Sequence, residues 1–289
     1  MSRSSFTFDK KMTKETYTPG HTKNATDFMG KRTLESHGFF FQPYLEDSLD
    51  VLDLGCGPGT ISIGLAQSTS GRVAGIDFGE SQIDKARENA IAAECSNLEF
   101  HLGSCYEFPF EDESFDRVFS HALMEHLRDP VAALKEACRV LRPNGVIGIC
   151  SPDADGWLLS PPSKELDSAV NAYADLQASN GGDLRIGKQF GVILKKAGFA
   201  DIHLSARYEC YPSLQFIGEY LALQLEQKGM LQEAKTFRDW SGSDGGMFAQ
   251  AWVAAIGIKK SNNKRSSRAE ERGSDLNDGP PYAKATEDK

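Results

Sequence analysis

The sequence predicts an α/β fold, with a mostly parallel sheet of seven strands and helices on both faces. Short apolar runs alternate with amphipathic stretches between about residues 51 and 150, and strand–helix–strand is the order that builds a parallel sheet. The first run ends in three glycines at alternate positions, which indicates a tight turn. The first two runs each carry an aspartate near the end, which places carboxylates at one edge of the sheet.

The 289 residues suffice for one large domain with insertions. We expect an N-terminal segment with a cap helix at 1–44 and a main domain at 45–260. Insertions at 151–183 and 211–245 interrupt the regular order of elements in the main domain. The tail at 261–289 is charged and poor in apolar residues, which predicts disorder.

Charge and hydropathy exclude several classes of protein. A net charge of −9 repels nucleic acid and anionic membranes, so we expect no nucleic-acid partner. No run approaches the roughly 18 apolar residues of a membrane span, so we expect no integral membrane segment. The six cysteines lack C-x-x-C spacing and the N-terminus lacks the apolar core of a secretory signal. We therefore predict reduced thiols and a cytoplasmic location.

The glycine-rich turn follows the first strand, Val51–Leu54, and contains Gly55, Gly57 and Gly59. Glycine permits positive φ and leaves no Cβ between the backbone and a ligand. A dinucleotide site has the spacing G-x-G-x-x-G and backbone N–H groups directed at a pyrophosphate. Here the spacing is G-x-G-x-G, and Pro58 has no N–H group to donate. The turn therefore predicts a ligand other than a phosphate.

The turn and the residue before it resemble motif I of the class I S-adenosylmethionine-dependent methyltransferases. That motif is an acidic residue, one spacer and G-x-G-x-G, and Asp53, Gly55, Gly57 and Gly59 occupy its fixed positions. The resemblance implies a Rossmann-like fold with S-adenosylmethionine as the cofactor. This molecule carries a sulfonium and an ammonium group and no phosphate, so the carboxylate of Asp53 suits its cationic part.

The second strand, within residues 71–78, ends in Asp77. This residue lies about twenty residues beyond the glycine turn, where a ribose-binding carboxylate is expected. A carboxylate can accept hydrogen bonds from two adjacent ribose hydroxyls. The neighbouring Phe78 would then lie on the adenine face. The alternatives are that Asp77 only caps the next helix, at 81–93, and that Phe78 packs in the core.

The third strand, at 98–102, is followed by Gly103, Ser104 and Cys105. In the resembling family this strand usually ends in Gly-Asp, and the acid meets the adenine amino group. Ser104 stands in the place of that acid, so a hydrogen bond to adenine would lack charge assistance. We expect Ser104 and Cys105 to contact the adenine.

The most family-specific sequence motif is F-P-F-E-D-E-S-F-D at 108–116, followed by E-H-L at 125–127. It resembles the ubiquinone and menaquinone biosynthesis group of methyltransferases, the methyltransferase type 11 group. The fourth strand, between these motifs, ends at Ser120 and His121, where a parallel sheet presents its ligand crevice. We expect both residues to bind the cofactor, His121 through its backbone. The spacing of His121 and His126 is not i, i+4, so we predict no metal site.

The later elements are less regular. We expect helical insertions to cover the carboxyl edge of the sheet, because substrate pockets are built from such segments. High alanine content leaves a helix as the alternative for the last strand. In chain order, we predict a helix at 131–140, a strand at 146–150, helices at 166–178 and 184–196, a strand at 201–208, an amphipathic helix at 213–240 and an antiparallel strand at 247–259.

The N-terminal stretch 22–44 has partly helical spacing of apolar residues, which predicts a helix packed on the sheet. In the resembling family such segments fold over the cofactor. This resemblance would place Tyr17 and His21 at the mouth of the site, with Tyr17 against the cofactor.

We therefore expect transfer of a methyl group from S-adenosylmethionine to a small-molecule acceptor, with release of S-adenosylhomocysteine. The sulfonium is an activated donor, so the protein mainly aligns the reactants and excludes water. The motifs do not name a catalytic residue. His21 and His126 are candidates for a base, because imidazole titrates near neutral pH. Aromatic and aliphatic residues after position 151 favour an apolar or amphipathic acceptor.

Three alternatives stay open at the level of sequence. The first is an NAD-dependent oxidoreductase that uses the same half-fold, although the glycine spacing and Pro58 disfavour it. The second is a non-catalytic module that binds S-adenosylmethionine and acts through a partner. The third is aminopropyl transfer, which would call for acidic residues around a polyamine.

Overall fold

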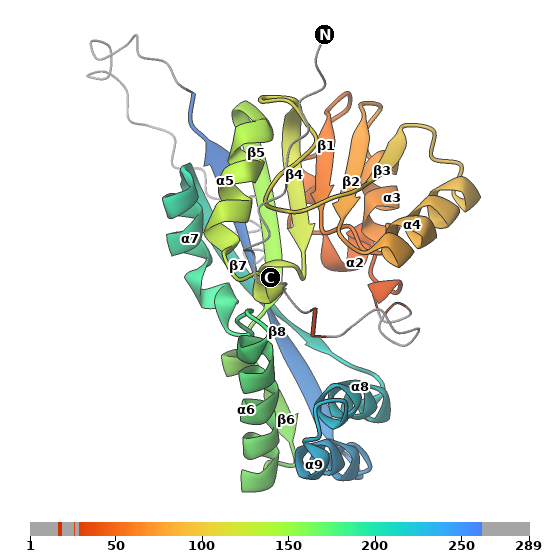
Figure 1. Cartoon of the computed structure of the whole chain (residues 1–289), viewed down its shortest axis with the longest axis vertical. Helices are drawn as coiled ribbons and strands as arrows, with labels where there is room; N and C mark the ends of the chain where they lie inside the picture. Colours follow the sequence, from red (N-terminus) through yellow and green to blue (C-terminus); the bar gives the residue numbers. More distant parts are fainter. Residues whose placement is uncertain (1–16, 19–25, 27–28, 262–289) are drawn as a thin grey trace, which may run out of the picture.

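The computed structural model describes residues 17–18, 26 and 29–261. Within this part of the chain, eight strands form one sheet (Figure 1). The strand order is β3-β2-β1-β4-β5-β8, and β6 and β7 both pair with β8. The five strands of the first half are parallel. They are β1 Val51–Leu54, β2 Val73–Asp77, β3 Leu98–Leu102, β4 Phe115–His121 and β5 Leu141–Pro152.

Both faces of the parallel half are covered, which explains why its strands read as continuous apolar runs. All four residues of β1 are buried, and they alternate between two core clusters. Leu52 and Leu54 pack toward α5 and α7, whereas Val51 packs toward α3. The helices of this half are α3 Thr60–Gln67, α4 Glu80–Ala92, α5 Pro130–Val140 and, after the 3₁₀ turn η4 Ile186–Gln189, α7 Phe190–Ala197.

The helix α5 shows how the sequence sets an element. The side chain of Asp129 accepts a hydrogen bond from the backbone N–H of Ala132, and Pro130 takes the first helical position, where no N–H is needed. Ala133, Leu134, Ala137 and Val140 then form the buried stripe along the helix. This pattern confirms the helix predicted at 131–140.

The last strand, β8 Met247–Lys259, is antiparallel to β5, and β7 Phe199–Cys210 is antiparallel to β8. The predicted antiparallel strand is confirmed, and the helical alternative is wrong. The second half of β8 pairs with β5, and its first half pairs with the short strand β6 Leu158–Ser160. This eighth strand was not predicted, because three residues are too few to show a period.

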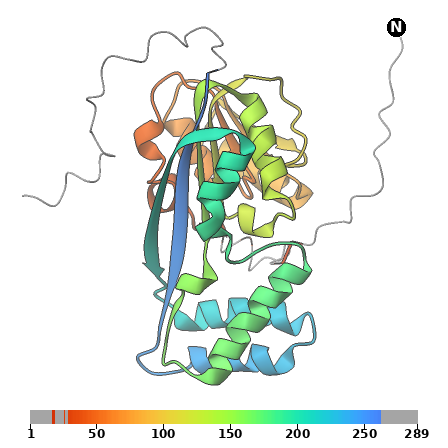
Figure 2. The same cartoon turned by 90° about the vertical axis from the view of Figure 1, so that its left-hand side faces the viewer.

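Three helices form a lobe with its own hydrophobic core at the far end of β7 and β8 (Figures 1 and 2). They are α6 Lys164–Ser179, α8 Leu214–Glu226 and α9 Leu231–Ser241. The sequence predicted one helix at 213–240, and this was wrong. The chain turns between α8 and α9 at Gly229, which has a φ of 78° that a continuing helix cannot contain.

The predicted helix at 22–44 is interrupted in its described part. Thr26 and Met29 are helical, α2 Leu34–His37 ends at Gly38, and a 3₁₀ turn follows, η1 Gln42–Tyr44. Between them, Phe41 is fully buried and its ring lies 5.4 Å from that of Phe119 on β4. The predicted tail at 261–289 lies outside the described residues, apart from residue 261. Among the described helices, none has the length and apolar character needed to cross a membrane.

Gly59 begins α3 with a φ of 76°, and a Cβ there would lie 2.9 Å from the Cβ of Ala86. Gly229 has nearly the same φ, 78°, but no atom lies within 4 Å of its Cβ position. We expect Gly229→Ala to cost about 1 to 2 kcal/mol of unfolding free energy through backbone strain alone. Gly59→Ala should cost a further 1 to 3 kcal/mol, roughly, through overpacking. Urea denaturation of both variants measures this difference, and equal losses would contradict tight packing of the glycine turn.

Candidate functional site

The glycine turn is held in shape by its own backbone. Gly55, Gly57 and Gly59 all have positive φ, between 51° and 76°. The N–H groups of Gly55 and Cys56 donate to the carbonyl of Ile76 on β2, and the N–H of Gly59 donates to the carbonyl of Cys56. Most amides of the turn therefore donate within the chain. What the turn presents to a ligand is a glycine backbone without side chains, rather than free N–H groups.

Asp77 joins the turn to the next strand. Its carboxylate accepts the N–H of Gly57 at 3.0 Å and the N–H of Gly79 at 2.8 Å. Gly79 is the N-cap residue of α4, so Asp77 positions the residue from which this helix starts, although α4 has no side-chain cap of its own. The same side chain also lines the cavity described below. The capping and ligand-binding interpretations of Asp77 are therefore compatible. Phe78 beside it is 56% exposed, which contradicts the alternative that it packs in the core.

Asp53 lies deeper. It is 3% exposed, and Ser62 of α3 donates its hydroxyl to the carboxylate at 2.5 Å. Burial raises the pKa of Asp53 to about 7, the hydrogen bond from Ser62 opposes this shift, and the negative charge of Asp77 adds to it. A nearby cation would stabilise the carboxylate of Asp53.

Ser120 and His121, the two predicted residues at the end of β4, have different places in the site. The hydroxyl of Ser120 donates to the carbonyl of Leu54 at 2.9 Å, so it ties β4 to β1 behind the site. His121 lines the cavity, and its ring packs 5.0 Å from that of His37. Its two nitrogens have no hydrogen-bond partner among the described residues, and burial lowers its pKa well below the usual value. The imidazole lies 4.6 Å from the ring of Trp252.

The N-terminal segment forms the opposite wall. The hydroxyl of Tyr17 donates to the sulfur of Met29 at 3.4 Å, and the Tyr17 ring meets that of His126 edge-on at 4.6 Å. Burial lowers the pKa of His126 to about 3, so its imidazole is neutral. The Nδ1 atom of His126 lies 2.7 Å from the amide nitrogen of Gln177 on α6. The other candidate base, His21, lies outside the described residues.

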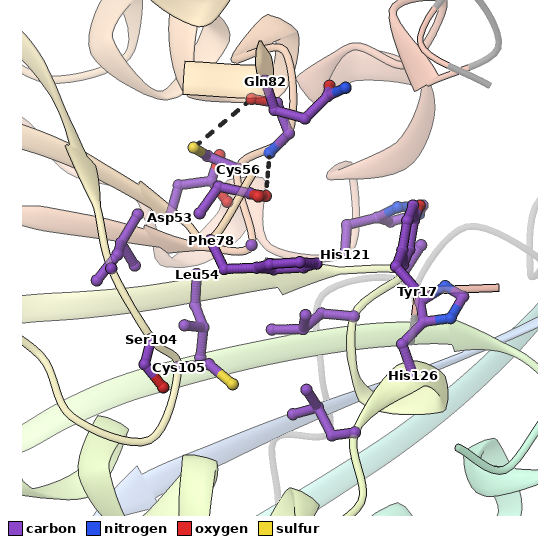
Figure 3. Close-up of a pocket in the computed structure, with 18 of the residues that line it drawn as sticks. Tyr17, Asp53, Leu54, Cys56, Phe78, Gln82, Ser104, Cys105, His121 and His126 are labelled. Atoms are coloured by element: carbon purple, nitrogen blue, oxygen red, sulfur yellow. Dashed lines mark hydrogen bonds between the residues drawn. The ribbon is translucent and has the colours of Figure 1, made fainter. Parts of the chain in front are cut away.

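These elements enclose one cavity of about 700 Å³ at the carboxyl ends of β1, β2, β3 and β4. Ser104 and Cys105 lie toward one end, and Tyr17 and His126 lie toward the other (Figure 3). Gly59 and Ser120 support the site from behind. The predicted residues that line the cavity are Tyr17, Asp53, Gly55, Gly57, Asp77, Phe78, Ser104, Cys105, His121 and His126.

Several lining residues escaped the sequence interpretation. Met29 and Arg32 come from the N-terminal segment, and Gln82 comes from α4. Arg128 directly follows the E-H-L motif in the sequence. None of the four lies in a recognisable motif. Two signals were available: Arg128 adjoins a family motif, and Arg32 is a cation in a segment expected to cover the site.

A family comparison decides the identity. The profile of a family described as a methyltransferase domain matches residues 45–198, which is more than half of the chain. The chain belongs to this family. The matched methyltransferase domain contains β1 to β5, the glycine turn and α6, but it stops before β7 and β8.

Individual relatives agree with this assignment. An uncharacterised methyltransferase of Schizosaccharomyces pombe is 39% identical over 131 residues, covering 43% of this chain and 46% of the relative. Demethylmenaquinone methyltransferase of Listeria monocytogenes is 34% identical over 118 residues, covering 39% of this chain and 50% of the relative. The chain spans about half the length of the curated relatives it matches.

A solved structure shows the same fold. Phosphoethanolamine N-methyltransferase 2 of Haemonchus contortus, in complex with S-adenosyl-L-methionine, aligns with a TM-score of 0.55 and 19% identity. The alignment covers 82% of this chain and 56% of that chain. The Rossmann-like fold predicted from the sequence is thereby confirmed.

The raised pKa of Asp53 has a measurable consequence. Between the unfolded pKa near 4 and the folded pKa of about 7, the folded protein binds a proton that the unfolded chain releases, so stability falls as pH rises. Between pH 5 and pH 8, the unfolding free energy of the wild type should fall by about 3 kcal/mol more than that of Asp53→Asn, because Asn cannot titrate. Urea denaturation without cofactor measures this loss. The control is Asp84→Asn, at an exposed position of α4. Equal losses in the wild type and Asp53→Asn would refute the raised pKa.

Proposed function

We propose that this protein transfers the methyl group of S-adenosylmethionine to a small molecule and releases S-adenosylhomocysteine. The observation that carries the proposal is the cavity of about 700 Å³, where Asp53 and Asp77 and the open glycine turn lie together. Such a site suits a ligand with a ribose and a cationic centre. The Haemonchus relative described in complex with S-adenosyl-L-methionine supports the choice of cofactor.

The order of side chains along the sheet gives the cofactor a direction. Ser104, Cys105 and the exposed ring of Phe78 would hold the adenine next to β3, and Asp77 at the end of β2 would hold the ribose. The amino-acid part would then extend past β1 toward β4. Most amides of the turn already donate within the chain, so the guanidinium of Arg32 is the better partner for the carboxylate of the cofactor.

The oxidoreductase alternative fits this site less well. The N–H of Gly57, which would face a pyrophosphate, donates to the carboxylate of Asp77 instead. A pyrophosphate on the turn would also lie close to the carboxylates of Asp53 and Asp77, and like charges repel in a buried site. Titration with NADH and with S-adenosylmethionine separates the two functions.

We propose that the lobe of α6, α8 and α9 covers the acceptor. The predicted insertions 151–183 and 211–245 contain these three helices. Its inner surface next to the main cavity is rich in aromatic rings, among them Trp157, Tyr173 and Phe248. This lining favours an apolar or amphipathic acceptor. All six cysteines are free thiols, in keeping with the predicted cytoplasmic location.

Asp77→Ala tests the proposed ribose contact. We expect the affinity for S-adenosylhomocysteine to fall by about 1.5 to 3 kcal/mol for each charge-assisted hydrogen bond lost. Calorimetric titration measures the loss, and Asp84→Ala on the surface of α4 is the matched control. An unchanged affinity in Asp77→Ala would remove this carboxylate from the cofactor site.

Methyl transfer itself is tested with a labelled donor. Purified protein is incubated with S-adenosylmethionine labelled in its methyl group and with a small-molecule extract of cells, and mass spectrometry follows the label. We expect the label to appear in a small molecule and S-adenosylhomocysteine to accumulate. Binding of the cofactor without any transfer would favour the non-catalytic module instead.

A further inference from the structure

A second, smaller cavity adjoins the main one. It has a volume of about 50 Å³ and lies between the ends of β4 and β5 and the helices α6 and α8. By volume it holds a small group of a ligand rather than a whole molecule. The two cavities share a wall made of Tyr17, Met29, Arg32, Ala122 and His126.

Two residues that line this second cavity each carry a buried polar atom with no hydrogen-bond partner among the described residues: Oε1 of Gln177 and Nε1 of Trp157. Gln177 is 1% exposed, and its amide nitrogen donates to the carbonyl of Glu125 at 2.7 Å. That contact fixes which end of the amide is the oxygen. An unmet buried acceptor and an unmet buried donor are costly unless a ligand satisfies them. A hydroxyl group can do both, because it donates one hydrogen bond and accepts others.

Glu125 lies in the wall of the same cavity. It is 2% exposed, accepts the hydroxyl of Ser151 at 2.7 Å, and lies 3.6 Å from Nε2 of His126. Burial raises the pKa of Glu125 to about 7, while the hydrogen bond from Ser151 and the charge of Arg32 lower it. Other titratable groups that interact with its charge are Tyr17, Tyr173, Tyr220 and Cys150.

We propose that the second cavity receives the methyl-accepting hydroxyl of a neutral aromatic compound and that Glu125 takes up its proton. The inference rests on the methyl transfer proposed above. The aromatic rings around the cavity favour a flat ligand. The guanidinium of Arg32, which the proposed function pairs with the carboxylate of the cofactor, also lies on the shared wall, and its N–H donors favour an acceptor oxygen over an ammonium.

The step balances. The hydroxyl oxygen attacks the methyl carbon, the carbon–sulfur bond breaks with its electron pair on sulfur, and the hydroxyl proton passes to the carboxylate of Glu125. The products are the methyl ether, S-adenosylhomocysteine and a neutral Glu125, so the positive charge of the donor and the negative charge of the carboxylate disappear together. His126 is a weaker base here, because its neutral imidazole has a pKa of about 3.

The test compares phenol with fluorobenzene, a ring of similar size that has no proton to give. Both are titrated into the complex with S-adenosylhomocysteine at pH 8 and at pH 6. We expect phenol to bind at least about tenfold more tightly than fluorobenzene at pH 8, as for a hydrogen bond to a charged group. The preference should shrink at pH 6, because Glu125 is then protonated.

Glu125→Gln should reduce the preference for phenol to about twofold and abolish its dependence on pH, since a neutral amide makes an ordinary hydrogen bond. Ser151→Ala keeps the carboxylate but removes a hydrogen bond that lowers its pKa, so the preference should remain and its loss on acidification should begin at a higher pH. The exposed Glu111→Gln makes the same chemical change elsewhere and should alter nothing. Unchanged affinity for S-adenosylhomocysteine shows that each variant is folded.

Three outcomes would overturn the inference. They are an equal affinity of the wild type for phenol and fluorobenzene, a preference that survives Glu125→Gln, and tighter binding of benzylamine, an ammonium at pH 8, than of phenol. Failure to bind S-adenosylhomocysteine at all would instead refute the proposed function, so the two failures are distinguishable.

Discussion

The carboxylate of Asp77 is the constraint on which the site depends. It accepts backbone N–H groups from the glycine turn after β1 and from the start of α4, and so fixes two segments that border the cavity. A carboxylate with two amide donors is held in one orientation before any ligand arrives. The sheet supplies the positions, because parallel strands end at one edge, and Asp77 keeps the turn open at that edge.

Sequence patterns predicted the parallel half well, because buried strands and amphipathic helices there have a clear period and the motifs mark each turn. Prediction failed where the pattern was short or had no visible break. The strand β6 has only three residues, and the sequence of α8 and α9 has the pattern of one helix, which Gly229 interrupts with its positive φ. Site residues inside motifs, such as Asp53 and Asp77, were predicted. Glu125 stands in the E-H-L motif, but its contact with Gln177 was not predicted, because it depends on how α6 folds back onto the segment after β4.

The two halves of the molecule have different physical characters. The parallel half presents backbone turns and carboxylates to the main cavity, whereas the lobe presents aromatic rings and a few buried polar atoms to the smaller one. The long strands β7 and β8 connect them and hold the lobe against the carboxyl edge of the sheet. This division would let the lobe change its acceptor without disturbing the cofactor site.

A crystal structure of the complex with S-adenosylhomocysteine tests the central claim most directly. The account predicts both ribose hydroxyls within hydrogen-bond distance of Asp77, the adenine beside Ser104 and Cys105, and the sulfur facing the wall that the two cavities share. A nucleoside bound in the reverse direction, or outside the cavity under the glycine turn, would contradict the account.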